Sequence, residues 1–132
     1  CVVKTKCTEG QATMVALNNL MITPYHPVID LVNDEKHWTF PISKGEPVNV
    51  FCPYMYSFVI ESRKSLIVER HVFATYGHNC MDQEVIQHDY FGTEKIIDDL
   101  KQIPTYGFGI VELSPGNFTR DYETKRVNGL IL

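Results

Sequence analysis

The sequence predicts a mainly β fold with a small C-terminal α+β extension. The chain has 132 residues, of which 44% are hydrophobic and 21% charged, and these values are typical of one globular domain. Short runs with alternating apolar and polar residues fill residues 1–80, and turn-forming residues separate them. Helical spacing is clear only once, after residue 80.

The first strands are predicted to form two hairpins. Residues 1–7 (CVVKTKC) alternate in polarity, and a Glu-Gly turn at 9–10 lets residues 12–17 (ATMVAL) return as the partner strand. The Asn-Asn pair at 18–19 then predicts a tight loop into residues 20–23 (LMIT), because asparagine tolerates positive φ.

Two prolines shape the next segment. Pro24 and Pro27 end the preceding strand and hold Tyr25 and His26 in a rigid, extended corner. Further short strands are predicted within residues 37–43 (HWTFPIS), 46–62 (EPVNVFCPYMYSFVIES) and 66–79 (LIVERHVFATYGHN).

The pattern changes after Cys80. Residues 92–104 (GTEKIIDDLKQIP) predict a helix with Thr93 as the N-cap and Pro104 as the stop. One more strand and a Pro-Gly turn are expected in residues 106–118. The apolar positions of the helix are Ile96, Ile97, Leu100 and Ile103, and the predicted solvent face carries Asp98, Asp99 and Lys101. We therefore divide the chain into a β core at 1–80 and an extension at 81–132, packed on the core.

Charge and cysteine content exclude several classes of protein. The net charge is −4 without any run of Lys or Arg, so the footprint of a nucleic-acid-binding protein is absent. No apolar run approaches 18 residues, so no transmembrane segment or signal sequence is expected within these residues, although a signal could lie upstream of Cys1. The four cysteines are irregularly spaced, which favours a reduced, intracellular chain, although the compartment stays open. The chain is expected to be a monomer.

No cofactor or metal is predicted. His71, His78, Cys80 and His88 are spaced unlike any common set of metal ligands. Asn117 begins a glycosylation sequon, which chance explains unless secretion is shown.

The segment YGHNC, residues 76–80, carries candidate chemistry. An asparagine amide can attack its own backbone carbonyl, close a succinimide and cut the chain, so Asn79 is a candidate for cyclisation. His78 could give the proton that the departing amine needs, and Cys80 could accept an acyl group. The alternative is an ordinary turn at the end of a strand.

Several segments agree in order with one known family. TPYHPV (23–28), YSFVIES (56–62) and YGHNC resemble the blocks of the hedgehog/intein (Hint) self-processing fold. CVVKTKC, ITPYHPV and YFGTEKIIDDL are similar to the Vint branch, whose Hint domains are attached to von Willebrand factor A domains. The resemblance covers residues 1 to about 113. It implies a horseshoe-like β fold followed by an adduct-recognition-like extension.

The resemblance also implies a reaction. In Hint chemistry a Cys at the start of the domain attacks the preceding carbonyl and converts a peptide bond into a thioester. The TxxH block corresponds to Thr23 and His26, which would hold and protonate the scissile amide. Cys1 is the candidate nucleophile, but CVVKTKC matches an internal Vint segment, so the alternative is a nucleophile upstream, with opening strands missing here.

The fate of the thioester distinguishes two branches of the family. An external nucleophile or adduct takes it in hedgehog-type processing, which residues 81–132 fit in position and size. A downstream residue takes it in inteins, which His78, Asn79 and Cys80 fit. The implied partners are an N-terminal flanking domain of the von Willebrand factor A type and the external nucleophile. Ser57 stands where the family often has an Asp.

Two other functions stay open from the sequence. The chain could be a catalytically inactive Hint-like interaction module that keeps the fold without its nucleophile. A papain-like cysteine hydrolase is less consistent with the sequence, because it needs a Cys at a helix N-terminus, and the one predicted helix begins near Thr93 without a neighbouring Cys.

Overall fold

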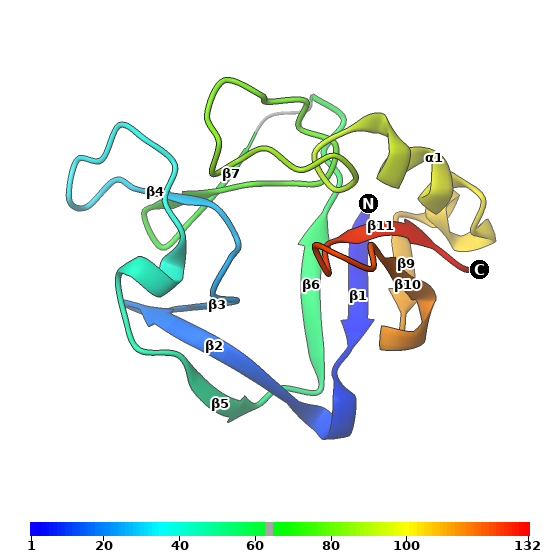
Figure 1. The fold of residues 1–132 in the computed structure, drawn as a ribbon, viewed down its shortest axis with the longest axis horizontal. Coiled ribbons are helices and arrows are strands. Elements are labelled where there is room, and N and C mark those ends of the chain that lie inside the picture. Colours follow the sequence, from blue (N-terminus) through cyan, green and yellow to red (C-terminus); the bar gives the residue numbers. More distant parts are fainter. Residues whose placement is uncertain (63–64) are drawn as a thin grey trace.

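The chain folds into a mainly β structure, as predicted (Figure 1). The computed structural model describes residues 1–62 and 65–132, and these contain 11 strands and one α-helix. The strands are short because Gly, Pro and Asn interrupt the apolar runs. They are β1 (Val2–Lys6), β2 (Gln11–Leu17), β3 (Leu20–Ile22), β4 (Val28–Asp30), β5 (Val48–Phe51), β6 (Tyr54–Phe58), β7 (Leu66–Val68), β8 (His71–Phe73), β9 (Ile110–Leu113), β10 (Phe118–Arg120) and β11 (Val127–Leu130), and the helix is α1 (Glu94–Lys101).

The strands form four small sheets. Three of them have three strands each, in the orders β6-β1-β9, β3-β2-β5 and β4-β8-β7, and β10 pairs with β11. In Figure 1, β2 and β5 run along the bottom, β4 and β7 lie at the upper left, and α1 lies at the upper right, above β9. β9 runs parallel to β1, so a strand from the second part of the chain completes the first sheet.

The predicted hairpin between the first two strands is wrong. β1 pairs with β6 and β9, whereas β2 pairs with β3 and β5. Between β1 and β2 the chain turns a corner rather than reversing, with Glu9 and Gly10 both at positive φ. Turn residues alone cannot show this difference, because corners and reversals use the same left-handed conformations.

Other local predictions are confirmed. The Asn-Asn loop joins β2 to β3 as a two-residue hairpin, with Leu17 opposite Leu20 and Asn18 at φ 56°. Helix α1 has Thr93 as its N-cap, whose side chain accepts a hydrogen bond from the Lys95 N–H. The strand expected in residues 37–43 is wrong: Thr39 makes one bridge to the start of β4, and the Pro41–Ser43 segment is a 3-10 turn.

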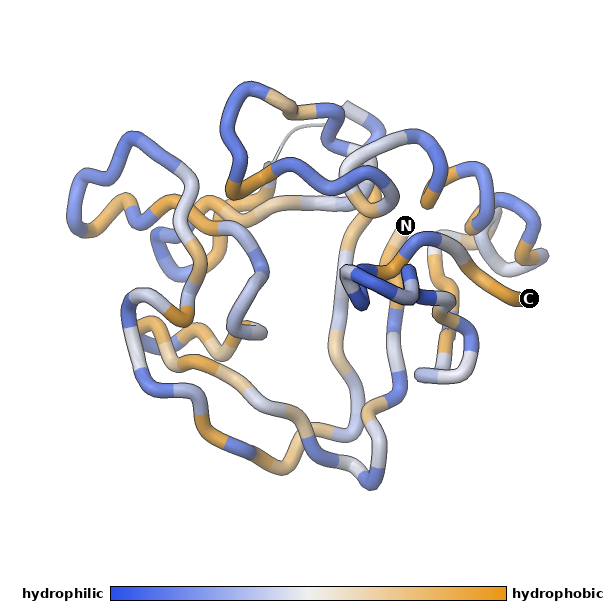
Figure 2. The backbone as a smooth tube through the Cα atoms, viewed as in Figure 1, coloured by the Kyte–Doolittle hydropathy of each residue, from blue (hydrophilic) through white to orange (hydrophobic). Residues whose placement is uncertain are grey.

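Two apolar clusters form the core. Figure 2 shows apolar segments in β1, in β9 and on the inner side of α1. The cluster beneath α1 combines residues from both parts of the chain, namely Val3, Val59, Tyr90, Ile96, Ile97, Leu100, Val111 and Leu113. The second cluster lies around β2 and β4 and contains Val15, Leu17, Ile22, Val28 and Phe73.

The sequon asparagine is part of the fold. Asn117 accepts hydrogen bonds from the Ser114 N–H and hydroxyl, and its own side-chain amide donates to the Ile131 carbonyl at 2.8 Å. These bonds fix the start of the β10-β11 hairpin, so the amide nitrogen that a glycan would need is already engaged.

Candidate functional site

The candidate site lies at one end of the β4-β8 strand pair. Val28 pairs with Phe73, and beyond this pair the Ala74 N–H donates to the Pro27 carbonyl at 3.1 Å. His26 comes next, with its Nε2 2.7 Å from the Ala74 carbonyl oxygen. The strand pairing therefore brings the TxxH segment next to the chain that leads into YGHNC.

The geometry around His26 fixes which ring nitrogen holds the proton. A carbonyl oxygen can only accept, so Nε2 donates to Ala74 and the neutral ring keeps its lone pair on Nδ1. The His26 N–H donates to the Thr23 carbonyl at 3.3 Å, and the ring packs edge-on against Phe73 at 5.7 Å between centroids. Burial lowers the pKa of His26, the hydrogen bond to Ala74 opposes this, and nearby His78 lowers it further.

His78 contacts the peptide bond that the cyclisation hypothesis would break. The backbone N–H of Cys80, which is the nitrogen of the Asn79–Cys80 bond, donates to His78 Nδ1 at 2.8 Å. Burial lowers the pKa of His78, and a hydrogen bond with the Ile86 backbone partly opposes this. The imidazole is therefore neutral near pH 7 and accepts a hydrogen bond from this amide.

The second part of the chain holds the His78 segment in place. The Gly77 N–H donates to the Phe91 carbonyl at 2.7 Å, and the Asn79 N–H donates to the Gly92 carbonyl at 2.8 Å. A Cβ added to Gly92 would lie 3.0 Å from His78 Cε1 and 2.8 Å from the His88 backbone oxygen. Only glycine leaves room for the His78 ring at this point.

His88 is a third histidine in the same region. Its Nδ1 accepts hydrogen bonds from the backbone N–H groups of Tyr90 and Phe91, and its ring packs on the Phe91 ring at 4.8 Å. Burial, mainly, and then the charge of Arg126 lower the pKa of His88 to about 4, and His78 contributes in the same direction. His78 thus lies within electrostatic range of both His26 and His88.

One known family matches almost the whole chain. The model of the family described as Vint: Hint-domain matches residues 1–129. The chain belongs to the Hint-domain family. This match spans both parts of the chain and confirms the resemblance found in the sequence. Membership places the fold in a class of autoprocessing domains. No curated protein matches the chain.

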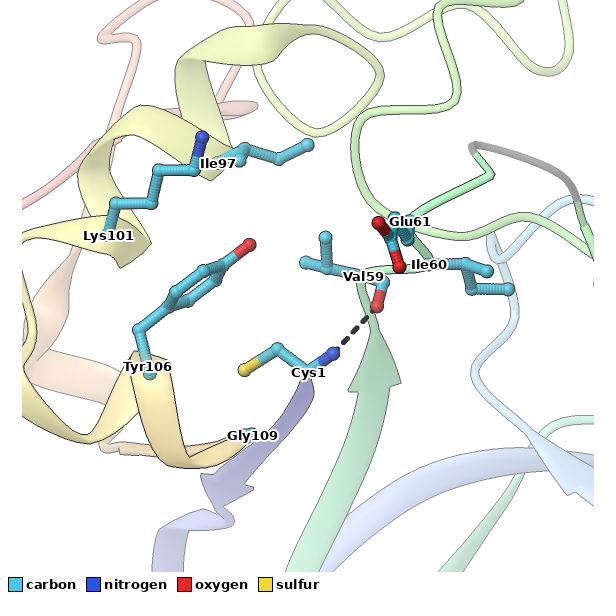
Figure 3. A pocket seen from close by; sticks show the side chains of 9 residues that line it. Cys1, Val59, Ile60, Glu61, Ile97, Lys101, Tyr106 and Gly109 are labelled. Carbon is cyan, nitrogen blue, oxygen red and sulfur yellow. Dashed lines mark hydrogen bonds between the residues drawn. The ribbon is translucent and has the colours of Figure 1, made fainter.

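Within this Hint domain, Cys1 lies apart from the two histidines. Its backbone nitrogen donates to the Val59 carbonyl at 2.8 Å, and Figure 3 shows its thiol on the side of Tyr106. It lines a cavity of about 340 Å³ together with Val59, Ile60, Glu61, Ile97, Lys101, Tyr106, Gly107 and Gly109. This lining includes neither the TxxH segment nor the YGHNC segment.

The residues after His78 have distinct environments. Asn79 is exposed at φ 57°, and its side-chain nitrogen lies 3.5 Å from a Glu94 carboxylate oxygen. The Cys80 thiol lies 3.5 Å from an Asp82 carboxylate oxygen. Burial and the hydrogen bond and charge of Asp82 raise the pKa of Cys80, so this thiol stays protonated near neutral pH.

The structure also accounts for Ser57. Its side chain makes a hydrogen bond with the Tyr76 hydroxyl, and the Tyr76 ring stacks on Phe91 at 4.8 Å and 13° between planes. Burial raises the pKa of Tyr76, while the Ser57 hydrogen bond opposes the rise. Ser57 therefore helps to anchor the strand that leads to His78.

The sequence did not identify the supporting residues Ala74, Gly92 and His88. A backbone carbonyl such as that of Ala74 has no side-chain signature, and neither does the close approach of Gly92 to His78. Within residues 1–62 and 65–132, no group of three or more His, Cys, Asp or Glu side chains is placed to hold a metal ion. No helix in the same residues has the length and apolar character needed to cross a membrane.

Proposed function

We propose that this Hint domain is a single-turnover self-processing module that cleaves or transfers its N-terminal flanking segment through a Cys thioester. The observation that supports this most directly is the position of His26, in the TxxH segment, beside the chain that carries His78. Neither ring is paired with a carboxylate in the contacts described above. Both pKa values are lowered, so both imidazoles are neutral near pH 7, which is the form that acts as a base.

His26 is proposed to move the proton in the first step. A cysteine thiol attacks the preceding carbonyl carbon, a carbon–sulfur bond forms, and the carbon–nitrogen bond breaks. His26 Nδ1 accepts the thiol proton and returns it to the departing amine, which keeps the step balanced. Thr23 is proposed to hold the scissile amide by a hydrogen bond.

Cys1 is the candidate nucleophile within this chain. Its pocket lacks His26 and His78, so attack by Cys1 would need the TxxH segment and β1 to approach each other. An upstream Cys in the natural precursor is the alternative, and the first experiment distinguishes the two.

The second part of the chain is proposed to determine the fate of the thioester. Residues 81–132 contact the His78 segment through Phe91 and Gly92, so an external nucleophile bound there would lie close to the histidines. The flanking domain that the resemblance implies, a von Willebrand factor A domain, would be the segment released.

A fusion carrying the natural upstream residues and a reporter protein before Cys1 tests this proposal. We expect dithiothreitol or hydroxylamine to release the reporter, and the released end identifies the cysteine used. Cys1→Ala abolishes release if Cys1 is the nucleophile and leaves it unchanged if the nucleophile lies upstream. His26→Ala should abolish release in both cases, whereas the exposed His37→Ala should not. Absence of thiol-dependent release would contradict the proposal.

A second cut at Asn79 is part of the proposal. The Asn79–Cys80 amide nitrogen faces His78 Nδ1 at 2.8 Å, but a neutral ring has no proton there to give. Because the pKa of His78 lies below 6.5, cyclisation should be slow at pH 7 and faster at pH 5, where the imidazolium is more populated. Mass spectrometry would detect a fragment ending in a succinimide at residue 79. A cleavage rate that does not change with pH would argue against His78 as the acid.

The inactive interaction module is the competing function. The separation of the Cys1 pocket from the histidines favours it. A precursor that stays full length in the presence of thiol, with Cys1 and every upstream Cys intact, would support this alternative.

A further inference from the structure

Cys7 and Cys52 face each other at the corner of the fold. Cys7 follows the end of β1, and Cys52 lies between β5 and β6. Their sulfur atoms are 3.9 Å apart, although the residues are 45 positions apart in the chain. Both cysteines carry free thiols in this structure.

Backbone hydrogen bonds hold the two cysteines opposite each other. The Cys7 N–H donates to the Pro53 carbonyl at 2.9 Å, and the Cys52 N–H donates to the Gly10 carbonyl at 2.8 Å. On one side of this corner β1 pairs with β6, and on the other side β2 pairs with β5. The two thiols therefore lie at the corner where the β1-β6 pair meets the β2-β5 pair.

We propose that Cys7 and Cys52 form a reversible disulfide that locks this corner. A disulfide has a sulfur–sulfur distance of about 2.05 Å, so the two thiols must approach by roughly 2 Å, which side-chain rotation can supply. The site is independent of the proposed self-processing, because neither cysteine belongs to the TxxH or YGHNC segments.

The oxidant in this proposal is a low-molecular-weight disulfide such as oxidised glutathione. Cys52 is the more exposed thiol, since only 5% of Cys7 is accessible. The Cys52 thiolate attacks glutathione disulfide, forming a mixed disulfide and releasing one glutathione thiolate. Cys7 then loses its proton and attacks the Cys52 sulfur, which releases the second glutathione. Two protein thiols are oxidised and one glutathione disulfide is reduced to two thiols.

The environment of Cys7 determines how fast the second step proceeds. Burial, mainly, and the hydrogen bond and charge of Cys52 raise the pKa of Cys7 to about 11. Few Cys7 thiols are ionised near pH 7, so the attack of Cys7 on the mixed disulfide should be slow there. Its rate should rise about tenfold for each pH unit up to 10.

The test uses the full chain in buffers with defined ratios of reduced to oxidised glutathione. Peptide mapping by mass spectrometry should find one peptide pair linked through Cys7 and Cys52, lost on reduction. The loop closed between these residues is long, so the oxidised chain should melt roughly 5–15 °C higher than the reduced chain. Cys52→Ser should remove both effects, and the matched change Cys80→Ser should remove neither.

Three results would overturn the proposal. The first is a mixed disulfide at Cys52 that persists at pH 9 without forming the Cys7–Cys52 disulfide. The second is a disulfide that joins Cys1 or Cys80 in place of this pair. The third is an oxidised chain that melts no higher than the reduced one. Because Cys7→Ser places a hydroxyl in a buried position, Cys7→Ala serves as the second variant, and it should also lose the linked peptide.

Discussion

The two ends of the β4-β8 strand pair use histidine in opposite ways. At one end His71 lies beside Asp30, with His71 Nε2 3.7 Å from an Asp30 carboxylate oxygen and both residues buried. At the other end His26 contacts the Ala74 carbonyl and the Phe73 ring. The strand pair has three residue pairs, of which Asp30–His71 is the last at one end and Val28–Phe73 the last at the other.

The Asp30 end is a closed hydrogen-bonded network. The Asp30 carboxylate accepts hydrogen bonds from the backbone N–H groups of Val32 and Asn33 and from the Asn33 side chain. Burial raises the pKa of Asp30, but these hydrogen bonds and His71 outweigh it and lower the pKa. Glu35 accepts the Asp30 N–H and pairs with Lys44. The network holds the loop after β4 in place.

The histidine end lacks such a carboxylate partner in the contacts described above. Burial lowers the pKa of both His26 and His78, and the proximity of His78 lowers that of His26 further. The comparison teaches that a nearby carboxylate, and not burial alone, distinguishes the surroundings of His71 from those of His26 and His78.

The largest expected effect comes from replacing His26 and, for comparison, His71 with glutamine. His26→Gln keeps a donor for the Ala74 carbonyl, so we expect a folded chain whose reporter release is about 10²–10⁴-fold slower. His71→Gln should lower the melting temperature and leave the release rate of the folded protein unchanged. Release kinetics and thermal melts of both variants check this. Equal losses of activity would remove the distinction between the two ends.

The next effect concerns the stability of the carboxylate end. Asp30→Ala removes a buried acceptor of three hydrogen bonds and leaves the buried His71 without its carboxylate neighbour, so the free energy of unfolding should fall by about 3 kcal/mol. Urea denaturation measures this change. Asp98→Ala, on the exposed side of α1, is the matched control and should change the free energy of unfolding by less than about 0.5 kcal/mol. A similar small loss for Asp30→Ala would show that the network is not structural.

Gly92→Ala tests how the histidine end is supported. The added Cβ would lie 2.8 Å from the His88 backbone oxygen and 3.0 Å from His78, so one of the two segments must shift. We expect a loss of about 1–3 kcal/mol in stability and a change in the His78 imidazole resonances. NMR titration of the histidines and urea denaturation measure both. Gly116→Ala, with no atom within 4 Å of its Cβ, is the control and should leave the His78 resonances unchanged.

The smallest effect is a pH dependence from His88. Its pKa is about 4 in the folded chain and 6.5 in the unfolded chain, so the unfolded state binds more protons between these values. The stabilising contribution is complete above pH 6.5 and is lost as the pH falls toward 4. Because His88 is half-buried, we discount the shift for solvent and expect at most about 2 kcal/mol. The stability advantage of the parent chain over His88→Gln should diminish as the pH falls from 6.5 toward 4, and a constant difference would contradict the assignment.

The sequence by itself determined the local elements and the family. Period-two alternation predicted the strands, Thr93 and Pro104 bounded the helix, and the Asn-Asn pair gave the β2-β3 loop. These features depend on residues a few positions apart, so propensity and turn chemistry are enough to find them. The ordered blocks of motifs predicted the Hint-domain family, which the match over residues 1–129 confirmed.

Only the tertiary structure decided which distant segments meet. Val2 pairs with Ile110 in β9, and no local pattern predicts that the strand after α1 completes the first sheet. The same pairings place His26 beside the Ala74 carbonyl and bring Cys7 close to Cys52. They also keep the Cys1 pocket separate from the histidines. Alternation tells which face of a strand is buried but not which strand lies beside it, because partner choice depends on how the whole core packs.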